Sequence, residues 1–561
     1  MGIVLFFSLA LRPAFAITGI ANGPGPVEIQ RMIKSNLARA YAASVFLYDY
    51  DTVAKRIVGP RFSGVVVTSS GVIMTAGHAS RTGKAYMVAF PNDKKEYVAI
   101  GLGRIASFDA ALVQIKAAGE FPFAEMGWSS SLQVNEPCMS IAYPGSFHPK
   151  KLVVRFGYIA EIINGKRQML RSTCLMEPGD SGGPVFDLSG RVIGIRSNIT
   201  QGLQNNYDVP VDVFRSYWSA LLKPEDYQFL PKADPVAIDP LAKQKLTFKS
   251  EDQLSIQLSA MESKLEKYSV QLMNGADSSF AVGTLVDLHK LIPKKANPKK
   301  TFVISKNSLI RDGVIVKMGV TQIGTRILYR DQQSDLVLLE LDKEVNGGLD
   351  AAAFSADTLT ISDLGNILIS PNPAGNGHTS VIGSLEFTLP KMFSGGYLGL
   401  SFGENSEKKL IVGVQDKSPA NRAGLKIGDE ILSINGIDVP NATMFSREVQ
   451  KNSPEEIVKI RYQRNGESYL TDVKLGRRPQ NVSAHVAEQF LGGKSARFDG
   501  FNHAFVHDAT LLPSECGGPV FDLNGNFRGI NMARYSRTSS IATSPAEIAS
   551  FIKTALTHTN S

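Results

Sequence analysis

The sequence predicts a mostly β protein in which one β-rich unit occurs twice. Short runs rich in valine and isoleucine alternate with turns from about residue 43 to 215, a pattern typical of antiparallel barrels or sandwiches. Similar runs return later in the chain, so that FSGVVVT at 62–68 resembles FAVGTLV at 280–286. An octapeptide is also repeated, as SGGPVFDL at 181–188 and CGGPVFDL at 516–523. These repeats indicate an internal duplication.

The composition is that of an ordinary globular protein. A chain of 561 residues is too long for one core and predicts three or four domains. The net charge of +8 comes from 60 basic and 52 acidic residues spread thinly along the chain. The densest basic run, Lys294-Lys295 with Lys299-Lys300, lacks interleaved aromatic residues, and we expect a solvated loop there. We therefore expect no nucleic-acid partner.

The first 16 residues resemble a secretory signal peptide. A short apolar run ends in Ala14-Phe15-Ala16, an A-x-A type of cleavage site, although no lysine or arginine precedes the run. No later stretch approaches the roughly 18–20 apolar residues of a membrane helix. We expect a secreted or periplasmic protein without a membrane span.

Turn and helix signals divide the rest of the chain. Helical periodicity is expected at 27–40, at 211–222 and within 251–270, and four prolines between 224 and 240 mark a linker. The expected segments are the signal peptide (1–16), the first unit (27–222), a linker with a helix (223–270), the second unit (271–394 and 479–556) and an insert (395–478).

The first unit carries the residues that an activated serine needs. Such a serine requires a general base, a carboxylate that orients the base, and amide donors for the oxyanion. MTAGH places His78 after a strand, and FDAAL places Asp109 at a strand start. PGDSGGP places Ser181 in a glycine-rich turn, where the N–H groups of Gly179 and Ser181 can converge on one oxygen.

TAGH, DAALVQI and GDSGGPVFDLSGRVIGI resemble the trypsin-like (chymotrypsin-fold) serine proteases, and their compact spacing resembles the HtrA/Deg type. The resemblance covers about residues 40–220. It implies a fold of two barrels, with His78 as general base, Asp109 as its orienter and Ser181 as nucleophile. It implies no cofactor and no metal. Leu175 falls near the base of the primary pocket, which implies a preference for apolar side chains.

The second unit matches this frame but lacks the base. TAGH at 75–78 aligns with residues 305–308, so His78 corresponds to Ser308, Asp109 to Asp335 and Ser181 to Cys516. An unassisted thiol is only a few per cent ionised at neutral pH. His289, His503 and His507 lie outside the matched position. We expect a degenerate, noncatalytic protease domain, with a redox-sensitive thiol as the alternative.

The insert resembles a PDZ domain. GGYLGLSF at 395–402 and SPANRAGLKIGDEILSINGIDV at 418–439 carry the resemblance. In such a domain a peptide adds to a sheet edge and a loop of N–H groups accepts its terminal carboxylate. Tyr397, Leu398, Gly399 and Leu400 would form that loop and edge, with C-terminal peptides as partners. The alternative is a β domain that acts only as a spacer.

The expected fold is therefore two chymotrypsin-like double β-barrel domains plus a PDZ-like domain inserted in the second. The expected function is an exported, ATP-independent serine endopeptidase that acts on unfolded or regulatory proteins in extended form. The rival is a chaperone-like or peptide-binding scaffold whose protease site is silent at rest. A third reading, a basic adhesin on a relic protease fold, depends on the net charge alone. A homo-oligomer stays open, as does the state of Cys138 and Cys174, either a disulfide or two buried thiols.

Overall fold

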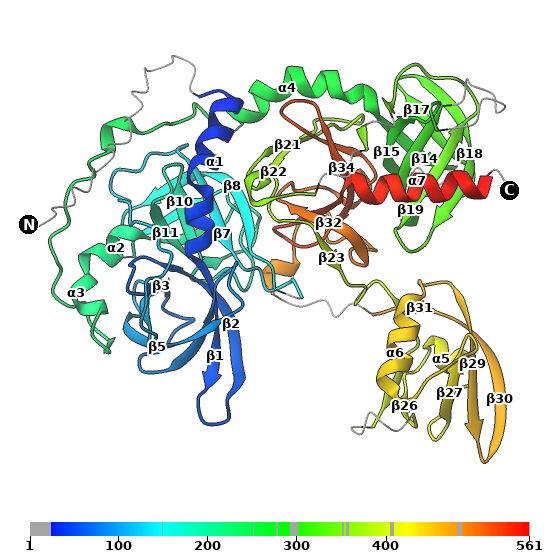
Figure 1. Cartoon of the computed structure of the whole chain (residues 1–561), viewed down its shortest axis with the longest axis horizontal. Coiled ribbons are helices and arrows are strands. Elements are labelled where there is room, and N and C mark those ends of the chain that lie inside the picture. Colours follow the sequence, from blue (N-terminus) through cyan, green and yellow to red (C-terminus); the bar gives the residue numbers. More distant parts are fainter. Residues whose placement is uncertain are drawn as a thin grey trace, which may run out of the picture.

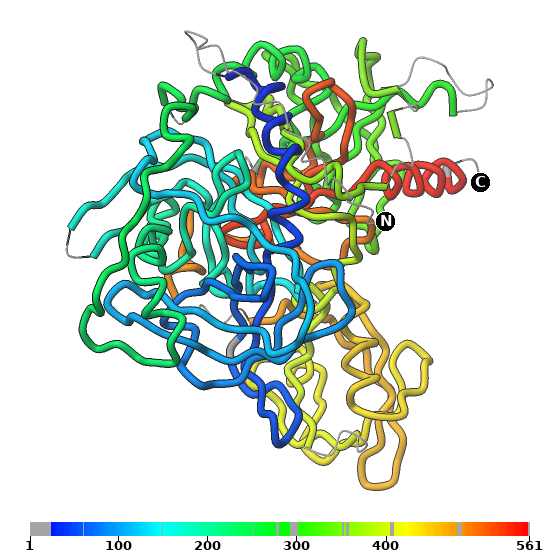
Figure 2. Tube along the Cα trace, turned by 60° about the vertical axis from the view of Figure 1, so that its left-hand side comes forward, coloured from blue at the N-terminus to red at the C-terminus, as the bar shows by residue number. Residues whose placement is uncertain are grey.

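The computed structural model describes residues 24–148, 150–165, 167–250, 252–275, 279–291, 301–350, 353–354, 358–403, 409–479 and 485–559. The expected signal peptide and the basic run at 294–300 lie outside these residues. Two large β units pack side by side, and a smaller β domain lies apart from them (Figure 1). Figure 2 shows the same smaller domain projecting below the second unit.

The first unit consists of two barrels. Helix α1 (Pro26–Ala43) leads into the first barrel, in which the additional pairing of β5 with β6 closes a sheet that β13 extends. Its strands are β1 (Ser44–Asp51), β2 (Arg56–Val66), β3 (Val72–Ala76), β4 (Ala85–Ala89), β5 (Glu96–Ile105), β6 (Ala110–Ile115) and β13 (Asp226–Tyr227).

The second barrel of this unit is closed by six strands in the order β10-β11-β12-β9-β8-β7. They are β7 (Pro137–Ala142), β8 (Val153–Ile163), β9 (Met169–Ser172), β10 (Pro184–Asp187), β11 (Val192–Ile199) and β12 (Asn206–Pro210). Helices α2 (Val211–Ser216) and α3 (Trp218–Leu221) end the unit, which confirms the helix expected at 211–222.

The second unit repeats this plan with one open sheet. Its first barrel is closed by the pairing of β14 with β15, and its other sheet has the order β22-β21-β33-β34-β35-β32-β23. The barrel strands are β14 (Ser269–Asn274), β15 (Ser279–Asp287), β16 (Phe302–Lys306), β17 (Val314–Met318), β18 (Thr321–Asp331), β19 (Leu336–Leu341) and β20 (Leu349–Asp350). The open sheet consists of β21 (Ile367–Ser370), β22 (His378–Val381), β23 (Phe387–Leu389), β32 (Phe501–His507), β33 (Pro519–Asp522), β34 (Phe527–Arg534) and β35 (Ser540–Thr543).

The insert enters the second unit at the tip of a hairpin. In the first unit the long strand β8 pairs with both β7 and β9. In the second unit its place is taken by β22, which pairs with β21, and β23, which pairs with β32. The smaller domain therefore occupies the connection that corresponds to the β8–β9 turn. Hairpin tips accept insertions because few contacts are lost there.

The smaller domain has its own core. Leu398, Ile431 and Phe445 belong to a buried cluster separate from the one shared by the two large units. Its elements are β24 (Gly396–Tyr397), β25 (Leu400–Phe402), β26 (Ile411–Val414), α5 (Pro419–Arg422), β27 (Glu430–Ile434), β28 (Ile437–Asp438), α6 (Ala442–Lys451), β29 (Ile457–Arg464), β30 (Glu467–Lys474) and β31 (Gly476–Arg477).

The remaining helices join or cover the units. Helix α4 (Gln253–Leu265) lies within the segment expected at 251–270 and crosses from the first unit to the second (Figure 1). Helix α7 (Pro545–Thr559) packs on β18 and β34. Among the described residues, no helix is both long and apolar enough to cross a bilayer. The mostly β class, the double barrel of the first unit and the inserted small β domain are confirmed. The double barrel expected for the second unit is not: one of its sheets stays open, because β22 and β23 have no strand pairing with each other in the part of the chain that the structure describes.

Candidate active site

The register of β3 and β6 brings His78 and Asp109 together. Ala76 at the end of β3 pairs with Ala110 at the start of β6. The Gly77 amide then donates to the Asp109 carbonyl oxygen at 2.8 Å. A Cβ at Gly77 would come within 3.0 Å of the Asp109 backbone, so the close approach favours glycine. Asp109 itself has a positive φ of 61°, a strained conformation of the kind that clusters at functional sites.

Three groups hold the Asp109 carboxylate. The Nδ1 atom of His78 lies 3.0 and 3.1 Å from its two oxygens, and the His78 amide donates to Oδ1 at 2.6 Å. The Ser197 hydroxyl donates to Oδ2 at 2.5 Å. Burial raises the pKa of Asp109, but the hydrogen bonds from His78 and Ser197 outweigh it and hold the pKa below its ordinary value. The carboxylate is therefore ionised and orients His78.

Ser181 lies in a tight turn against β2. Its carbonyl oxygen accepts from the Ser63 amide at 2.9 Å, and Gly182 follows with a φ of 84°. A Cβ at Gly182 would lie 2.2 Å from the Ser63 carbonyl oxygen, so a larger residue does not fit. The amides of Gly179 and Ser181 donate to no protein group in the described part of the chain. They are therefore available to an oxyanion.

One cavity of about 760 Å³ brings His78, Asp109 and Ser181 together. The described residues show no hydrogen bond between the Ser181 hydroxyl and His78, although both line this cavity. Apolar surface comes from Phe62, Met176 and Ile199. Leu175, on which the expected apolar pocket depended, does not line the cavity. Polar groups also line it: Arg61, Arg104, Arg167, Glu177, Ser197, Asn198 and His485.

The sequence did not point to Ser197 or to the ion pair beneath Ser181. Asp180 is fully buried, and its carboxylate binds Arg155 of β8 at 2.8 Å. Burial raises the pKa of Asp180, and Arg155 opposes this rise. Asp180 precedes Ser181 directly, and this adjacency was the one available signal. Neither Arg155 nor Ser197 lies in a motif.

The second unit keeps the same backbone geometry at its corresponding site. Lys306 at the end of β16 pairs with Leu336 of β19, just as Ala76 pairs with Ala110. The Ser308 amide donates to Asp335 Oδ1 at 2.8 Å, and Asp335 has a φ of 62°. The Cys516 carbonyl oxygen accepts from the Val282 amide at 3.3 Å. Ser308 and Asp335 are therefore in contact, and Cys516 lies in a turn that bonds back to β15 as the Ser181 turn bonds back to β2.

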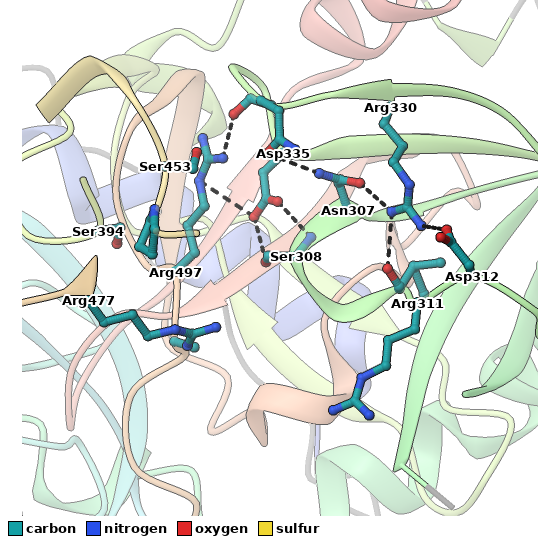
Figure 3. Close-up of a pocket in the computed structure, with 14 residues that line it drawn as sticks. Asn307, Ser308, Arg311, Asp312, Arg330, Asp335, Ser394, Ser453, Arg477 and Arg497 are labelled. Carbon is teal, nitrogen blue, oxygen red and sulfur yellow. Dashed lines mark hydrogen bonds and ion pairs between the residues drawn. The ribbon is translucent and has the colours of Figure 1, made fainter. Parts of the chain in front are cut away.

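The Asp335 carboxylate has different neighbours from Asp109. The Ser308 hydroxyl donates to it at 2.9 Å, and the cations of Lys306 and Arg497 lie 3.8 and 3.6 Å away. Figure 3 shows Arg497 and Ser308 close to Asp335. Lys306 is buried, and burial lowers its pKa although Asp335 opposes this. Ion pairing and a hydroxyl therefore replace the imidazole.

Cys516 is fully buried. The cavity of about 490 Å³ over this site is lined by Ser308 and Asp335 but not by Cys516. Burial raises the pKa of the Cys516 thiol. Its sulfur lies 3.8 Å from the Ser495 hydroxyl. His507, another histidine of this unit, hydrogen-bonds the Ser380 hydroxyl. Burial lowers the pKa of His507 to about 3, so its imidazole is neutral at physiological pH.

The turn expected to bind peptides in the smaller domain is anchored through its carbonyl oxygens. Those of Leu398 and Gly399 accept from the amides of Ala420 and Gln415 at 2.9 and 2.8 Å. Gly399 has a φ of 79°. The adjacent strand β25, which begins at Leu400, pairs only with β26 among the described strands, so its other edge is open. Leu398 is buried in the core.

Cys138 and Cys174 are two buried free thiols in the structure. Their sulfur atoms lie 3.9 Å apart. Hydrogen bonding with Cys174 and burial raise the pKa of Cys138 far above its ordinary value. The Cys138 thiol is therefore protonated and unreactive in the folded state.

Comparisons with known proteins match two parts of the chain. Residues 62–195 match the trypsin-like peptidase domain, and residues 396–475 match the PDZ domain. A probable periplasmic serine endoprotease DegP-like of Hahella chejuensis is 29% identical over 164 residues, which cover 27% of this chain and 33% of that protein. Serine protease HTRA1 of Xenopus tropicalis is 28% identical over 165 residues, which cover 28% of this chain and 35% of the relative.

These matches span about a third of the relatives' length. A solved structure, the HtrA-type protease AlgWS227A with tripeptide, aligns at 15% identity over 80% of this chain and 97% of its own, with a TM-score of 0.30. That score is too low to support an argument about the whole chain. The chain therefore contains a trypsin-like peptidase domain, which carries His78, Asp109 and Ser181, and a PDZ domain.

Proposed function

We propose that this protein is a serine endopeptidase of the HtrA type that cuts unfolded or regulatory proteins without ATP. The observation that carries the proposal is the joint placement of three groups in one cavity. The Asp109 carboxylate holds Nδ1 of His78 at 3.0 Å, and Ser181 lines the same cavity. The similarity to serine endoproteases supports this reading.

The proposed reaction is acyl transfer. Nε2 of His78 takes the proton of the Ser181 hydroxyl as its oxygen attacks the peptide carbonyl carbon, and later gives that proton to the leaving amine. Asp109 stabilises the imidazolium that forms, with Ser197 fixing the carboxylate. The amides of Gly179 and Ser181 donate to the oxyanion. Water then hydrolyses the acyl-enzyme by the same proton transfers in reverse.

Extended polypeptides are the proposed substrates, and the PDZ domain is proposed to bind peptide C-termini. The open edge of β25 offers backbone groups to an added strand, as β-augmentation requires. Relatives named periplasmic endoproteases support export to the periplasm or beyond the cell. We propose no metal, no cofactor and no nucleic acid in this function.

The second protease-like unit is proposed to be noncatalytic. Ser308 occupies the place of the base, and a hydroxyl cannot accept the thiol proton at neutral pH. Cys516 is fully buried and does not reach the cavity above it. Substrate therefore has no route to the sulfur. The proposed bounds of this unit are 271–394 and 479–556, around the PDZ-like insert at 395–478.

A second candidate is a peptide-binding scaffold whose protease site is silent at rest. The missing hydrogen bond between Ser181 and His78, in the part of the chain that the structure describes, favours it. Catalytic hydrogen bonds often tighten only when substrate binds, so this geometry also suits an enzyme awaiting substrate.

A fluorophosphonate probe separates the two candidates. We expect labelling at Ser181 and cleavage of casein by the full-length protein. The probe is applied with and without a peptide that ends in an apolar residue and a free carboxylate. Labelling in both conditions supports the peptidase, and labelling only with peptide supports a site that is silent at rest. A protein that never labels, with Ser181→Ala as the matched blank, would contradict the peptidase proposal.

A further inference from the structure

A loop of the second unit is buried against the active-site turn of the first. Residues 535–539 connect β34 to β35, yet Tyr535, Arg537 and Thr538 are only 4%, 1% and 0% exposed. Loops usually lie on the surface because their backbone polar groups need water or a partner. The polar groups of this buried loop therefore need partners within the protein.

The turn that it meets is the one that supplies the proposed oxyanion donors. Asp180 lies between Gly179 and Ser181, and its carboxylate points inward to Arg155 at 2.8 Å. The same carboxylate accepts from the Glu177 amide at 2.9 Å. These contacts fix the orientation of Asp180 and of the Asp180–Ser181 peptide group, whose N–H is one of the two proposed oxyanion donors.

Thr538 bridges the two charged groups that hold this turn. Its hydroxyl donates to Glu177 Oε2 at 2.9 Å and accepts from Arg155 Nη2 at 3.3 Å. Arg155 is fully buried, and Glu177 is 5% exposed. A buried ion that loses a partner is not compensated by water, so removing this hydroxyl leaves both groups short of a hydrogen bond.

The neighbouring side chains of the loop hold the two segments that flank the turn. Arg537 donates to the Gly202 carbonyl oxygen at 2.6 Å, in the loop that leads to β12. Asn206, the first residue of β12, accepts from the Met176 amide at 3.0 Å, close to the turn. The Tyr535 hydroxyl donates to the Ser146 carbonyl oxygen at 2.6 Å.

The segment that contains Ser146 reaches the turn directly. The Tyr535 ring stacks on Phe147 with centroids 4.5 Å apart. The Ser146 amide donates to Glu177 Oε1 at 3.2 Å, and the Gly145 amide donates to the Pro178 carbonyl oxygen at 2.7 Å. Two of the segments that frame the turn, 145–147 and 202–206, thus contact residues 535–538.

We propose that the second protease-like unit positions the oxyanion turn of the first, through Tyr535, Arg537 and Thr538. These are positioning residues, because they act through Glu177, Arg155 and the flanking segments rather than on substrate. The inference rests on the proposed peptidase function of Ser181. It assigns to the noncatalytic unit an intramolecular role that requires the buried loop and not the chemistry of Cys516.

The test compares Thr538→Val with Thr538→Ser in the full chain. Valine keeps the shape and removes the hydroxyl, whereas serine keeps the hydroxyl. Loss of a transition-state interaction lowers kcat without raising KM, and one oxyanion donor is worth roughly 10²–10³ in kcat. We expect Thr538→Val to lower kcat on a peptide substrate by on the order of tenfold with KM nearly unchanged, because the donors are loosened rather than removed. Thr538→Ser should keep near-wild-type kcat.

Gln30→Leu is the matched control. Gln30 of α1 accepts from the Ile367 amide at 2.7 Å, so it joins the same two units away from the turn. We expect unchanged kcat in this variant. An equal loss of kcat in Gln30→Leu, or no loss in Thr538→Val, would overturn the inference while leaving the peptidase proposal intact.

Hydrogen exchange of the amides at 176–181 tests the inference independently of activity. Thr538→Val should speed their exchange relative to wild type and Gln30→Leu, and Thr538→Ser should not. Unchanged exchange in Thr538→Val overturns the inference even if the wild type shows no peptidase activity. Failure of the wild type to label at Ser181, with faster exchange in Thr538→Val, contradicts the peptidase proposal alone.

Discussion

The two large β units share the backbone geometry around one aspartate each and differ in the groups that surround the two carboxylates. Asp109 and Asp335 have φ values of 61° and 62°, and each accepts from the amide two residues past the end of the adjacent strand. Around Asp109 the partners are His78 and Ser197, which face an open cavity. Around Asp335 they are Ser308, Lys306 and Arg497, and Lys306 is buried. The first arrangement can move a proton, whereas the second neutralises a charge.

The nucleophile positions show the same contrast. Both turns bond back to the preceding barrel, through Ser63 for Ser181 and through Val282 for Cys516. Ser181 lines its cavity, while Cys516 is fully buried beneath another. The same turn and backbone hydrogen bonds therefore occur both beside an accessible serine and around a buried cysteine.

Replacing the two nucleophile-position residues should give opposite results. Ser181→Ala removes the attacking atom and should lower kcat by roughly 10⁴-fold or more. Cys516→Ala removes a buried sulfur and should leave kcat near wild type. Casein cleavage and a chromogenic peptide measure both. Comparable losses in the two variants would mean that the second unit takes part in the chemistry.

The two carboxylates should separate activity from stability. Asp109→Asn should lower kcat by about 10⁴-fold, because the imidazole loses its orienting partner, and should change stability little in comparison. Asp335→Asn should leave kcat nearly unchanged and cost about 3–5 kcal/mol of unfolding free energy, because Lys306 stays buried without its counter-charge. Kinetics and urea unfolding measure these effects. A stable Asp335→Asn variant would refute the charge-pair account.

Asp508, at the boundary between the units, should make stability depend on pH. Its carboxylate accepts from the amides of Phe156 and Val381, each at 2.8 Å. Burial raises its pKa from 3.8 to about 6, against the effect of these amides. The folded state therefore holds the proton more tightly than the unfolded state. The stability that protonated Asp508 gives to the folded state is complete below about pH 4 and is lost as pH rises through about 6.

The rise in the pKa of Asp508 from 3.8 to about 6 corresponds to a loss of roughly 3 kcal/mol of unfolding free energy over this pH range. Asp508→Asn cannot titrate, so the free-energy difference between wild type and variant should change by that amount between pH 4 and 7. Urea unfolding at several pH values measures it. Parallel pH profiles for the two proteins would show that Asp508 has an ordinary pKa in the folded state.

Giving the second unit the histidine and serine of the first unit should not make it react with a fluorophosphonate. Ser308→His with Cys516→Ser, in a Ser181→Ala background, supplies the residue types of the first unit. We expect no fluorophosphonate labelling, because position 516 is buried and Lys306 and Arg497 still neutralise Asp335. Mass spectrometry of the treated protein measures this. Labelling at position 516 would show that only the base had been lost.

Several helices and strands could be predicted from the sequence because local residue patterns encode them. The helices near 27–40 and 211–222 and the strand that precedes His78 follow from periodicity and turn residues, which act over a few positions. The alignment of Ser308, Asp335 and Cys516 with the first unit stays a prediction, and the matching register of β16 with β19 and of β3 with β6 is consistent with it. Leu175 does not line the cavity as expected, because the side chains that face a cavity depend on the packing of several loops.

The amino-acid sequence is enough to predict the β-rich repeat, the short motifs that contain His78, Asp109 and Ser181, and the PDZ-like insert. The packing of the chain in three dimensions is needed to see that Ser197 bonds Asp109, that Lys306 and Arg497 lie against Asp335, and that Thr538 meets Arg155 across 383 residues. Motifs are local because they encode a backbone shape. Ion pairs and buried hydroxyls join distant segments, and their partners are set by how the barrels pack.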